Sequence, residues 1–132
     1  MKMIMNKTVL IIDDSQSLRR LIKYSVNRVY KNLEYLEASD GREGLDLLRS
    51  GKKVDVIILD INMPRMDGMT FLNEKKKEEG MKNIPTIILT KKEENDLKAD
   101  NMNCGIVEYL PKPFNVSKMK EVLKKILEDE SS

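Results

Sequence analysis

Val9-Leu10-Ile11-Ile12 is a run of four apolar residues that leads directly into two acidic residues, Asp13-Asp14. A short apolar run bounded by polar residues is typical of a strand buried in a parallel sheet. Three later apolar runs also end beside polar residues: 56–59 before Asp60, 87–89 before Thr90, and 106–110 before Pro111 and Lys112. The four runs therefore predict four buried strands, each with a polar side chain near its carboxyl end.

The carboxyl ends of parallel strands meet at one edge of an open α/β sheet, and ligands bind in the crevice beyond that edge. If the four strands are neighbours, the crevice gathers three carboxylates, one hydroxyl and one ammonium group. Carboxylates that close repel one another unless a cation neutralises them. Oxygen ligands favour a hard divalent cation, so the pattern predicts Mg²⁺ at a site for a phosphoryl group.

Helical patterns separate the predicted strands. Apolar residues at helical spacing predict a first helix over 15–30, and Asp40 with Glu43 forms a capping box for a second helix that stops at Gly51. The other predicted elements are strands over 34–38, 84–89 and 105–110, helices over 69–79 and 115–127, and a short, weakly held helix over 91–103. This alternation predicts an α/β fold: a doubly wound, flavodoxin-like sheet of five parallel strands in the order 2-1-3-4-5.

Length and composition predict a single domain over residues 1–132, with a core over about 7–127 and a loose tail over 128–132. The 24 Lys and Arg against 22 Asp and Glu leave a net charge of +2, which argues against nucleic acid or membrane as the main partner. The chain has no histidine and one cysteine, which excludes histidine-based catalysis and multi-cysteine metal sites. No apolar stretch is long enough to span a bilayer, and a cytoplasmic location is expected.

Four motifs lie in order at the ends of the predicted strands: the acidic pair 13–14, the stretch 60–68 (DINMPRMDG), Thr90, and the stretch 109–114 (YLPKPF). Together they resemble the bacterial response-regulator receiver family, in particular its single-domain members of the chemotaxis type. The resemblance covers about residues 7–127. No single motif is specific, but the ordered set is, because each member stands at the end of its own strand.

The resemblance implies roles for individual residues. Asp60 matches the aspartate that accepts a phosphoryl group from the phosphohistidine of a histidine kinase or of a histidine phosphotransfer domain. The implied ligands of Mg²⁺, or of Mn²⁺, are Asp13, Asp14, Asp60 and the backbone carbonyl of Asn62. Lys112 matches the lysine that pairs with a phosphoryl oxygen, and the Lys112–Pro113 bond is expected to be cis.

Thr90 and Tyr109 match the residues that convert phosphorylation into a change of surface. The resemblance implies that the hydroxyl moves to the phosphoryl group and that the aromatic ring turns inward behind it. The implied output is the binding of a downstream protein to the fourth helix, fifth strand and fifth helix, without direct binding of nucleic acid. We therefore expect a signalling domain and not an enzyme. The domain is nevertheless expected to carry out its own phosphorylation and dephosphorylation chemistry.

Other interpretations remain open at this point. Asp13-Asp14 could cap a helix, Thr90 could be a turn hydroxyl, and Tyr109 could be an ordinary strand aromatic. The chain could be the receiver of a larger DNA-binding or enzymatic regulator. It could also be a phosphatase that forms an aspartyl phosphate. Such enzymes usually carry a second aspartate where this chain has Asn62, and a specificity cap for which no insertion is long enough.

Three positions depart from the family pattern. Lys75 occupies a place in the third helix that is usually apolar, and the whole run 74–79 is charged. This predicts a helix that is solvated in its second half and that frays or bends away early. Lys91 follows Thr90 where the residue is usually small. Pro111 removes a hydrogen-bond donor, which an edge strand tolerates.

Overall fold

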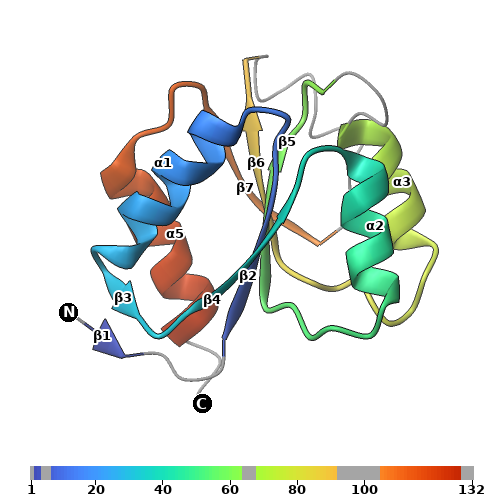
Figure 1. Cartoon of the computed structure of the whole chain (residues 1–132), viewed down its shortest axis with the longest axis horizontal. Helices are drawn as coiled ribbons and strands as arrows, with labels where there is room; N and C mark the ends of the chain where they lie inside the picture. The colour runs from blue at the N-terminus through green and yellow to red at the C-terminus, as the bar shows by residue number, and fades with distance from the viewer. Residues whose placement is uncertain (1, 4–6, 64–67, 92–104, 129–132) are drawn as a thin grey trace.

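A five-stranded parallel sheet forms the centre of the computed structural model, which describes residues 2–3, 7–63, 68–91 and 105–128 (Figure 1). The strands are β2 (Thr8–Ile12), β4 (Glu34–Ala38), β5 (Val56–Asp60), β6 (Thr86–Thr90) and β7 (Ile106–Pro111). Their order across the sheet is β4-β2-β5-β6-β7, and every neighbouring pair is parallel. Counted along the chain, these five strands have the order 2-1-3-4-5, so the predicted fold is confirmed.

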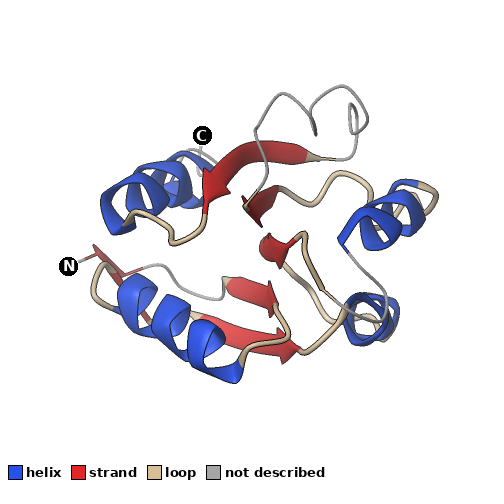
Figure 2. Ribbon diagram, turned by 90° about the horizontal axis from the view of Figure 1, so that it is seen from above, coloured by secondary structure: helices blue, strands red, loops and turns tan. Residues whose placement is uncertain are grey.

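Helices cover both faces of the sheet. They are α1 (Gln16–Asn27), α2 (Gly41–Arg49), α3 (Gly68–Lys76) and α5 (Val116–Glu128). Helices α1 and α5 lie on one face and α2 and α3 on the other, so the sheet is the middle of three layers (Figures 1 and 2). The Ser15 hydroxyl caps α1, and the Asp40 carboxylate caps α2 as predicted. Among the described helices, none is both long and apolar enough to cross a membrane.

The three central strands are buried along their whole length, which explains their apolar sequences. Alternate residues of a strand face opposite layers. Ile11 and Ile58 belong to the cluster under α1 and α5, whereas Leu10 and Ile57 belong to the cluster under α2 and α3. Burial on both faces and backbone pairing in the register Ile11↔Ile58 hold β2 and β5 side by side. Their carboxyl ends therefore lie next to each other.

Two short strands lie outside the five-stranded sheet. Strand β1 (Lys2–Met3) pairs in parallel with β3 (Tyr30–Lys31). The predicted first helix extended to residue 30, but α1 ends at Asn27. The Tyr30 ring is buried, and its hydroxyl donates a hydrogen bond to Glu128 Oε2 at 2.6 Å. This contact with the end of α5 joins residues 98 positions apart, so a local helical pattern does not reveal it.

At most of the other element ends, the observed boundary differs from the predicted one by one or two residues or not at all. Strand β6 begins at Thr86, two residues later than predicted, because Pro85 has no N–H to donate to the sheet. Pro111 ends β7, which is an edge strand, so the expectation for this proline is confirmed. Beyond Lys91 and Glu128, the predicted helix over 91–103 and the predicted tail over 128–132 lie outside the described residues.

The prediction of a solvated run over 74–79 is wrong at Lys75. Its side chain is fully buried, and its ammonium group donates a hydrogen bond to the Lys82 carbonyl oxygen at 2.9 Å. Helix α3 continues through this position to Lys76, while the rest of the run is exposed or partly exposed. A buried charge needs hydrogen-bond partners, and the turn after α3 provides one. The lysine thereby occupies a position where the family usually has an apolar residue.

The Lys75 ammonium group also lies close to Gly105, the residue before β7. Gly105 has φ +80°, and a Cβ atom there would lie 2.8 Å from the Ile84 carbonyl oxygen and 2.9 Å from Lys75 Nζ. Gly51, after α2, has a similar φ of +91°, but no atom within 4 Å of the corresponding Cβ position. Both glycines therefore have a positive φ, which favours glycine, but only Gly105 lacks space for a side chain.

We expect Gly51→Ala to lower the free energy of unfolding by about 1–2 kcal/mol, because a side chain strains the left-handed backbone. Gly105→Ala should lower it by about 3–5 kcal/mol, because the methyl group also meets backbone carbonyls that cannot easily move. Urea denaturation of both variants measures the difference. Equal losses would show that the turn before β7 relaxes around the added methyl group.

Candidate functional site

The predicted acidic residues meet at the carboxyl edge of the sheet. Asp13 directly follows β2, and Asp60 is the last residue of the neighbouring strand β5. One carboxylate oxygen from each of Asp13, Asp14 and Asp60 lies within 4.8 Å of the other two. Asp13 and Asp60 are both about 99% buried, whereas Asp14 is exposed. The expected cluster of three carboxylates is therefore present, with two members shielded from water.

The Asp60 carboxylate is paired with the predicted lysine. Asp60 Oδ1 lies 2.6 Å from Lys112 Nζ and accepts a hydrogen bond from the Asn62 N–H at 2.9 Å. The backbone N–H of Lys112 donates a hydrogen bond to the Thr90 carbonyl oxygen at 3.0 Å, which links the lysine to the end of β6. The Lys112–Pro113 peptide bond is cis, as expected. Asp60, Lys112 and Thr90 thus belong to one connected site.

The pKa of Asp13 is raised to about 6, chiefly because burial removes the carboxylate from water and also because the Asp60 and Asp14 charges lie nearby. Two features act in the opposite direction. The Ser15 N–H donates a hydrogen bond to Asp13 Oδ1 at 2.8 Å, and the Lys112 charge favours the ionised carboxylate. The net result is that Asp13 binds a proton more tightly than an ordinary aspartate does.

The arrangement fits a cation. Among the described residues, Asp13 Oδ2 and Asp60 Oδ2 are buried carboxylate oxygens that have no hydrogen-bond partner in the protein. An unsatisfied buried anion is costly, and a hard cation bound by carboxylate oxygens would satisfy it. The cluster of Asp13, Asp14 and Asp60 can therefore hold a metal ion.

The remaining predicted residues lie on β6 and β7 or just after β5 and β6. Thr90 is buried at the end of β6, opposite Pro111 of β7. Tyr109 is half-buried on β7 and packs against the cluster under α2 and α3. The Asn62 side-chain oxygen accepts a hydrogen bond from the N–H of Lys91 at 3.4 Å, and Lys91 is exposed. The metal role of the Asn62 carbonyl and the switch roles of Thr90 and Tyr109 stay predictions.

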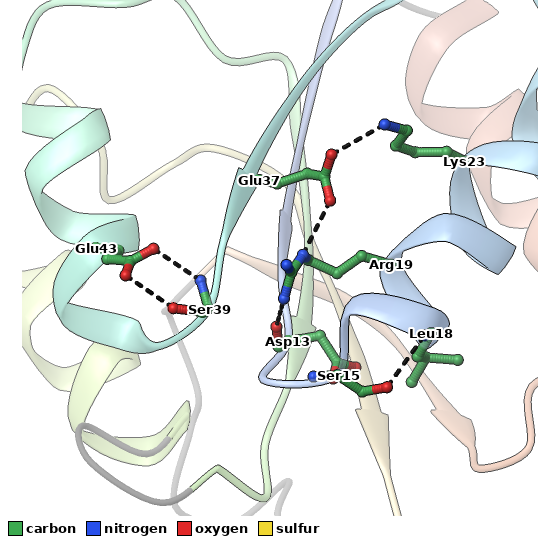
Figure 3. Close-up of polar contacts among 8 residues, drawn as sticks. All are labelled: Asp13, Ser15, Leu18, Arg19, Lys23, Glu37, Ser39 and Glu43. Atoms are coloured by element: carbon green, nitrogen blue, oxygen red, sulfur yellow. Dashed lines mark hydrogen bonds and ion pairs between the residues drawn. The ribbon is translucent and has the colours of Figure 1, made fainter.

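Two residues that were not among the predicted ones are linked to Asp13. Arg19 of α1 donates a hydrogen bond to the Asp13 carbonyl oxygen, and Glu37 of β4 binds the same guanidinium group (Figure 3). Arg19 lies four residues after the Ser15 cap, where a side chain can reach back over the first turn of the helix. That spacing permits the contact but does not specify it, because every residue carries a backbone carbonyl oxygen.

Comparison with known proteins matches residues 9–124 to the response regulator receiver domain. The chain belongs to this family. The family assignment made from the motifs is confirmed, and with it the receiver fold and a place in two-component signalling. The receiver domain is the part of a response regulator that accepts a phosphoryl group.

Relatives carry the receiver in different settings. The sensor histidine kinase CheAY of Helicobacter pylori is 36% identical over 118 residues; these are 89% of this chain but 14% of the kinase. A CheY homolog of Campylobacter jejuni, a chemotaxis protein, is 33% identical over 90% of this chain and 91% of its own length. The structure of chemotaxis protein CheY4 of Vibrio cholerae has a TM-score of 0.80 at 31% identity, covering 92% of this chain and 98% of CheY4.

The raised pKa of Asp13 gives the metal-free receiver a defined pH dependence. With a folded pKa of about 6 against 3.8 ordinarily, stabilisation by the bound proton is complete below about pH 4 and is lost as the pH rises through 6. Asp13→Asn cannot ionise, so in EDTA near neutral pH it should exceed the wild type in stability by up to about 3 kcal/mol.

Urea denaturation of wild type and Asp13→Asn across pH 4 to 8 measures this difference. It should be largest near neutral pH and should shrink as the pH falls below 6, because the wild-type carboxyl then becomes protonated. The comparison cancels the titration of carboxylates that lie away from the acidic cluster. A difference that does not vary with pH would show that Asp13 keeps an ordinary pKa.

Proposed function

We propose that this receiver accepts a phosphoryl group on Asp60 from a histidine kinase or a histidine phosphotransfer domain, and that phosphorylation alters a protein-binding surface. The supporting observation is the position of the Asp60 carboxylate. It is buried at the carboxyl edge of the sheet, 2.6 Å from the Lys112 ammonium group and beside the carboxylates of Asp13 and Asp14. A nucleophilic carboxylate between a fixed cation and a metal site suits phosphoryl transfer.

In the proposed transfer, an Asp60 oxygen attacks the phosphorus of a phosphohistidine. The O–P bond forms while the P–N bond breaks, and the electron pair of that bond returns to the donor imidazole, which takes a proton from water. Asp60 Oδ1 is already engaged by Lys112 and the Asn62 N–H, whereas Oδ2 has no hydrogen-bond partner among the described residues. Lys112 then pairs with a phosphoryl oxygen and offsets its charge.

The proposed metal is Mg²⁺ or Mn²⁺, and its proposed ligands are Asp13, Asp14, Asp60 and the Asn62 backbone carbonyl. Once bound, such a cation neutralises part of the charge on the transferred group. The unsatisfied oxygens of Asp13 and Asp60 support this assignment. A site with so few protein ligands leaves several water molecules on the cation, so we expect weak binding.

Thr90 and Tyr109 are proposed to carry the signal away from Asp60. The Thr90 carbonyl oxygen holds the Lys112 N–H, so a shift at the end of β6 is transmitted directly to the lysine of the site. Tyr109 lies on the edge strand β7 and is only half-buried. A ring at an edge strand can change its rotamer without disturbing the central strands, which suits a switch.

The proposed output surface lies along β7 and α5; the fourth helix, which was expected to complete it, lies outside the described residues. A recess of about 380 Å³ opens on this surface, and its lining residues are Pro85, Val107, Glu108, Val122, Lys125 and Ile126. Val107 is 49% exposed, so apolar area is available to a partner. A mainly apolar recess supports binding of a protein in preference to nucleic acid.

We further propose that the chain works as a cytoplasmic signalling domain and not as an enzyme. Its chemistry is then limited to gain and loss of its own phosphoryl group. A kinase-type partner is supported by the relative that is itself named a sensor histidine kinase. The named chemotaxis relatives support an output through protein binding.

Acetyl phosphate with Mg²⁺ should add one phosphoryl group to the wild type and none to Asp60→Asn, because the amide is a poor nucleophile. Intact mass spectrometry measures the adduct, and hydroxylamine should remove it, as expected for an acyl phosphate. Asp46→Asn, at an exposed aspartate on α2, is the matched control and should be labelled like the wild type. Equal labelling of Asp60→Asn would disprove the assignment.

Asp14→Ala should weaken Mg²⁺ binding at least about tenfold, because it removes a direct ligand. Asp14 is exposed and belongs to a repulsive cluster, so the free energy of unfolding should change by less than about 0.5 kcal/mol. Calorimetric titration and urea denaturation measure the two quantities, with Asp46→Ala as control. Unchanged metal affinity would exclude Asp14 as a ligand.

A further inference from the structure

The backbone of Asp13 is held on both sides. Its N–H donates a hydrogen bond to the Ala38 carbonyl oxygen of β4 at 3.0 Å, which extends the sheet pairing one residue beyond β2. Its carbonyl oxygen accepts a hydrogen bond from Arg19 Nη1 at 2.5 Å. The residue that begins the acidic pair is therefore fixed by the neighbouring strand and by a side chain of α1 (Figure 3).

Arg19 is itself held in place. Its Nε donates to Glu37 Oε1 at 2.9 Å, and the Arg19 side chain is only 14% exposed. The other Glu37 oxygen accepts a hydrogen bond from Lys23 Nζ at 2.9 Å. The hydrogen bonds from Lys23 and Arg19 lower the pKa of Glu37, so this carboxylate stays charged. The guanidinium group thus joins β4 to the turn that carries Asp13.

The contact is made with the backbone and leaves the carboxylates of the cluster to other partners. Asp13, Asp14 and Asp60 repel one another, and this repulsion favours movement of the turn at 13–15 away from β5. A positively charged side chain that bound the Asp13 carboxylate would also restrain the turn, but it would occupy an oxygen that the metal ion needs as a ligand. Arg19 restrains the same turn through the carbonyl oxygen, so it opposes the movement without competing for that oxygen.

We propose that Arg19 is a positioning residue that preorganises Asp13 and Asp14 for the metal ion, with Glu37 as its anchor. The role rests on the proposed metal site. Arg19 acts through the backbone of Asp13. It holds two mutually repelling ligands in place before the metal ion binds, which raises the affinity of the site for that ion. Residues that orient metal ligands in this indirect way commonly affect metal affinity by about 10–100-fold.

Lys23 provides a matched control. It lies one helical turn after Arg19 on α1 and binds the same Glu37 carboxylate at the same distance of 2.9 Å. Within the described part of the chain, its hydrogen bond goes to Glu37 and not to the turn at Asp13. A general loosening between α1 and β4 should therefore appear in variants of either residue, whereas a positioning effect should appear only at Arg19.

The test compares Arg19→Ala, Arg19→Lys and Lys23→Ala with the wild type. Calorimetric titration with Mg²⁺ and with Mn²⁺ gives the dissociation constants, and amide hydrogen exchange of Asp13 and Asp14 in EDTA reports the turn without metal. We expect Arg19→Ala to weaken metal binding about tenfold and to speed exchange at the turn, and Lys23→Ala to change neither. Arg19→Lys should also bind metal more weakly, because one ammonium group does not reproduce the fork of a guanidinium group.

Arg19→Lys keeps the helix and the charge, so it carries the test if Arg19→Ala does not fold. Wild-type affinity in both Arg19 variants would overturn the positioning role and leave the metal site intact. Equal losses in the Arg19 and Lys23 variants would also overturn it, in favour of general loosening. A wild type that binds neither Mg²⁺ nor Mn²⁺ would overturn the metal site together with this role.

Discussion

Electrostatic repulsion among three carboxylates is the constraint on which this receiver depends. Strands β2 and β5 are buried neighbours in parallel register, so they bring Asp13, which follows β2, close to Asp60 at the end of β5. The stability of the sheet therefore holds like charges together, and burial strengthens their effect on one another. Lys112 offsets part of the charge directly, while Arg19 restrains the backbone. The pairing of the strands and the Arg19 contact together limit how far the repulsion can relax.

Much of this arrangement could be predicted from the sequence, because the relevant signals are local. Apolar runs located four of the five strands, and the polar residues at or just after the ends of these runs included Asp13, Asp60, Thr90 and Lys112. Once the strand order is fixed by parallel pairing, those residues must lie at one edge. The fold and the gathering of the carboxylates at one edge therefore followed from pattern and topology.

The features that escaped prediction depend on partners far away or on backbone atoms. Tyr30 continues the helical spacing of α1, but its hydroxyl contact with Glu128 places it in β3. Lys75 stands in a charged run that suggests solvation, but its ammonium group is buried and donates a hydrogen bond to the Lys82 carbonyl oxygen. Arg19 recognises a carbonyl oxygen, a group that every residue carries, so sequence composition cannot single it out.

The burial of Lys75 also makes this residue a natural reporter of local opening. An amine-reactive ester modifies exposed lysines within seconds to minutes, but it can reach Lys75 only when α3 separates from the turn before β6. The extent of acylation at Lys75 therefore measures how often the structure opens near the start of β6 and β7, at the end of the sheet opposite the acidic cluster. A receiver that rearranges only near its carboxyl edge would keep Lys75 unlabelled in both of its signalling states.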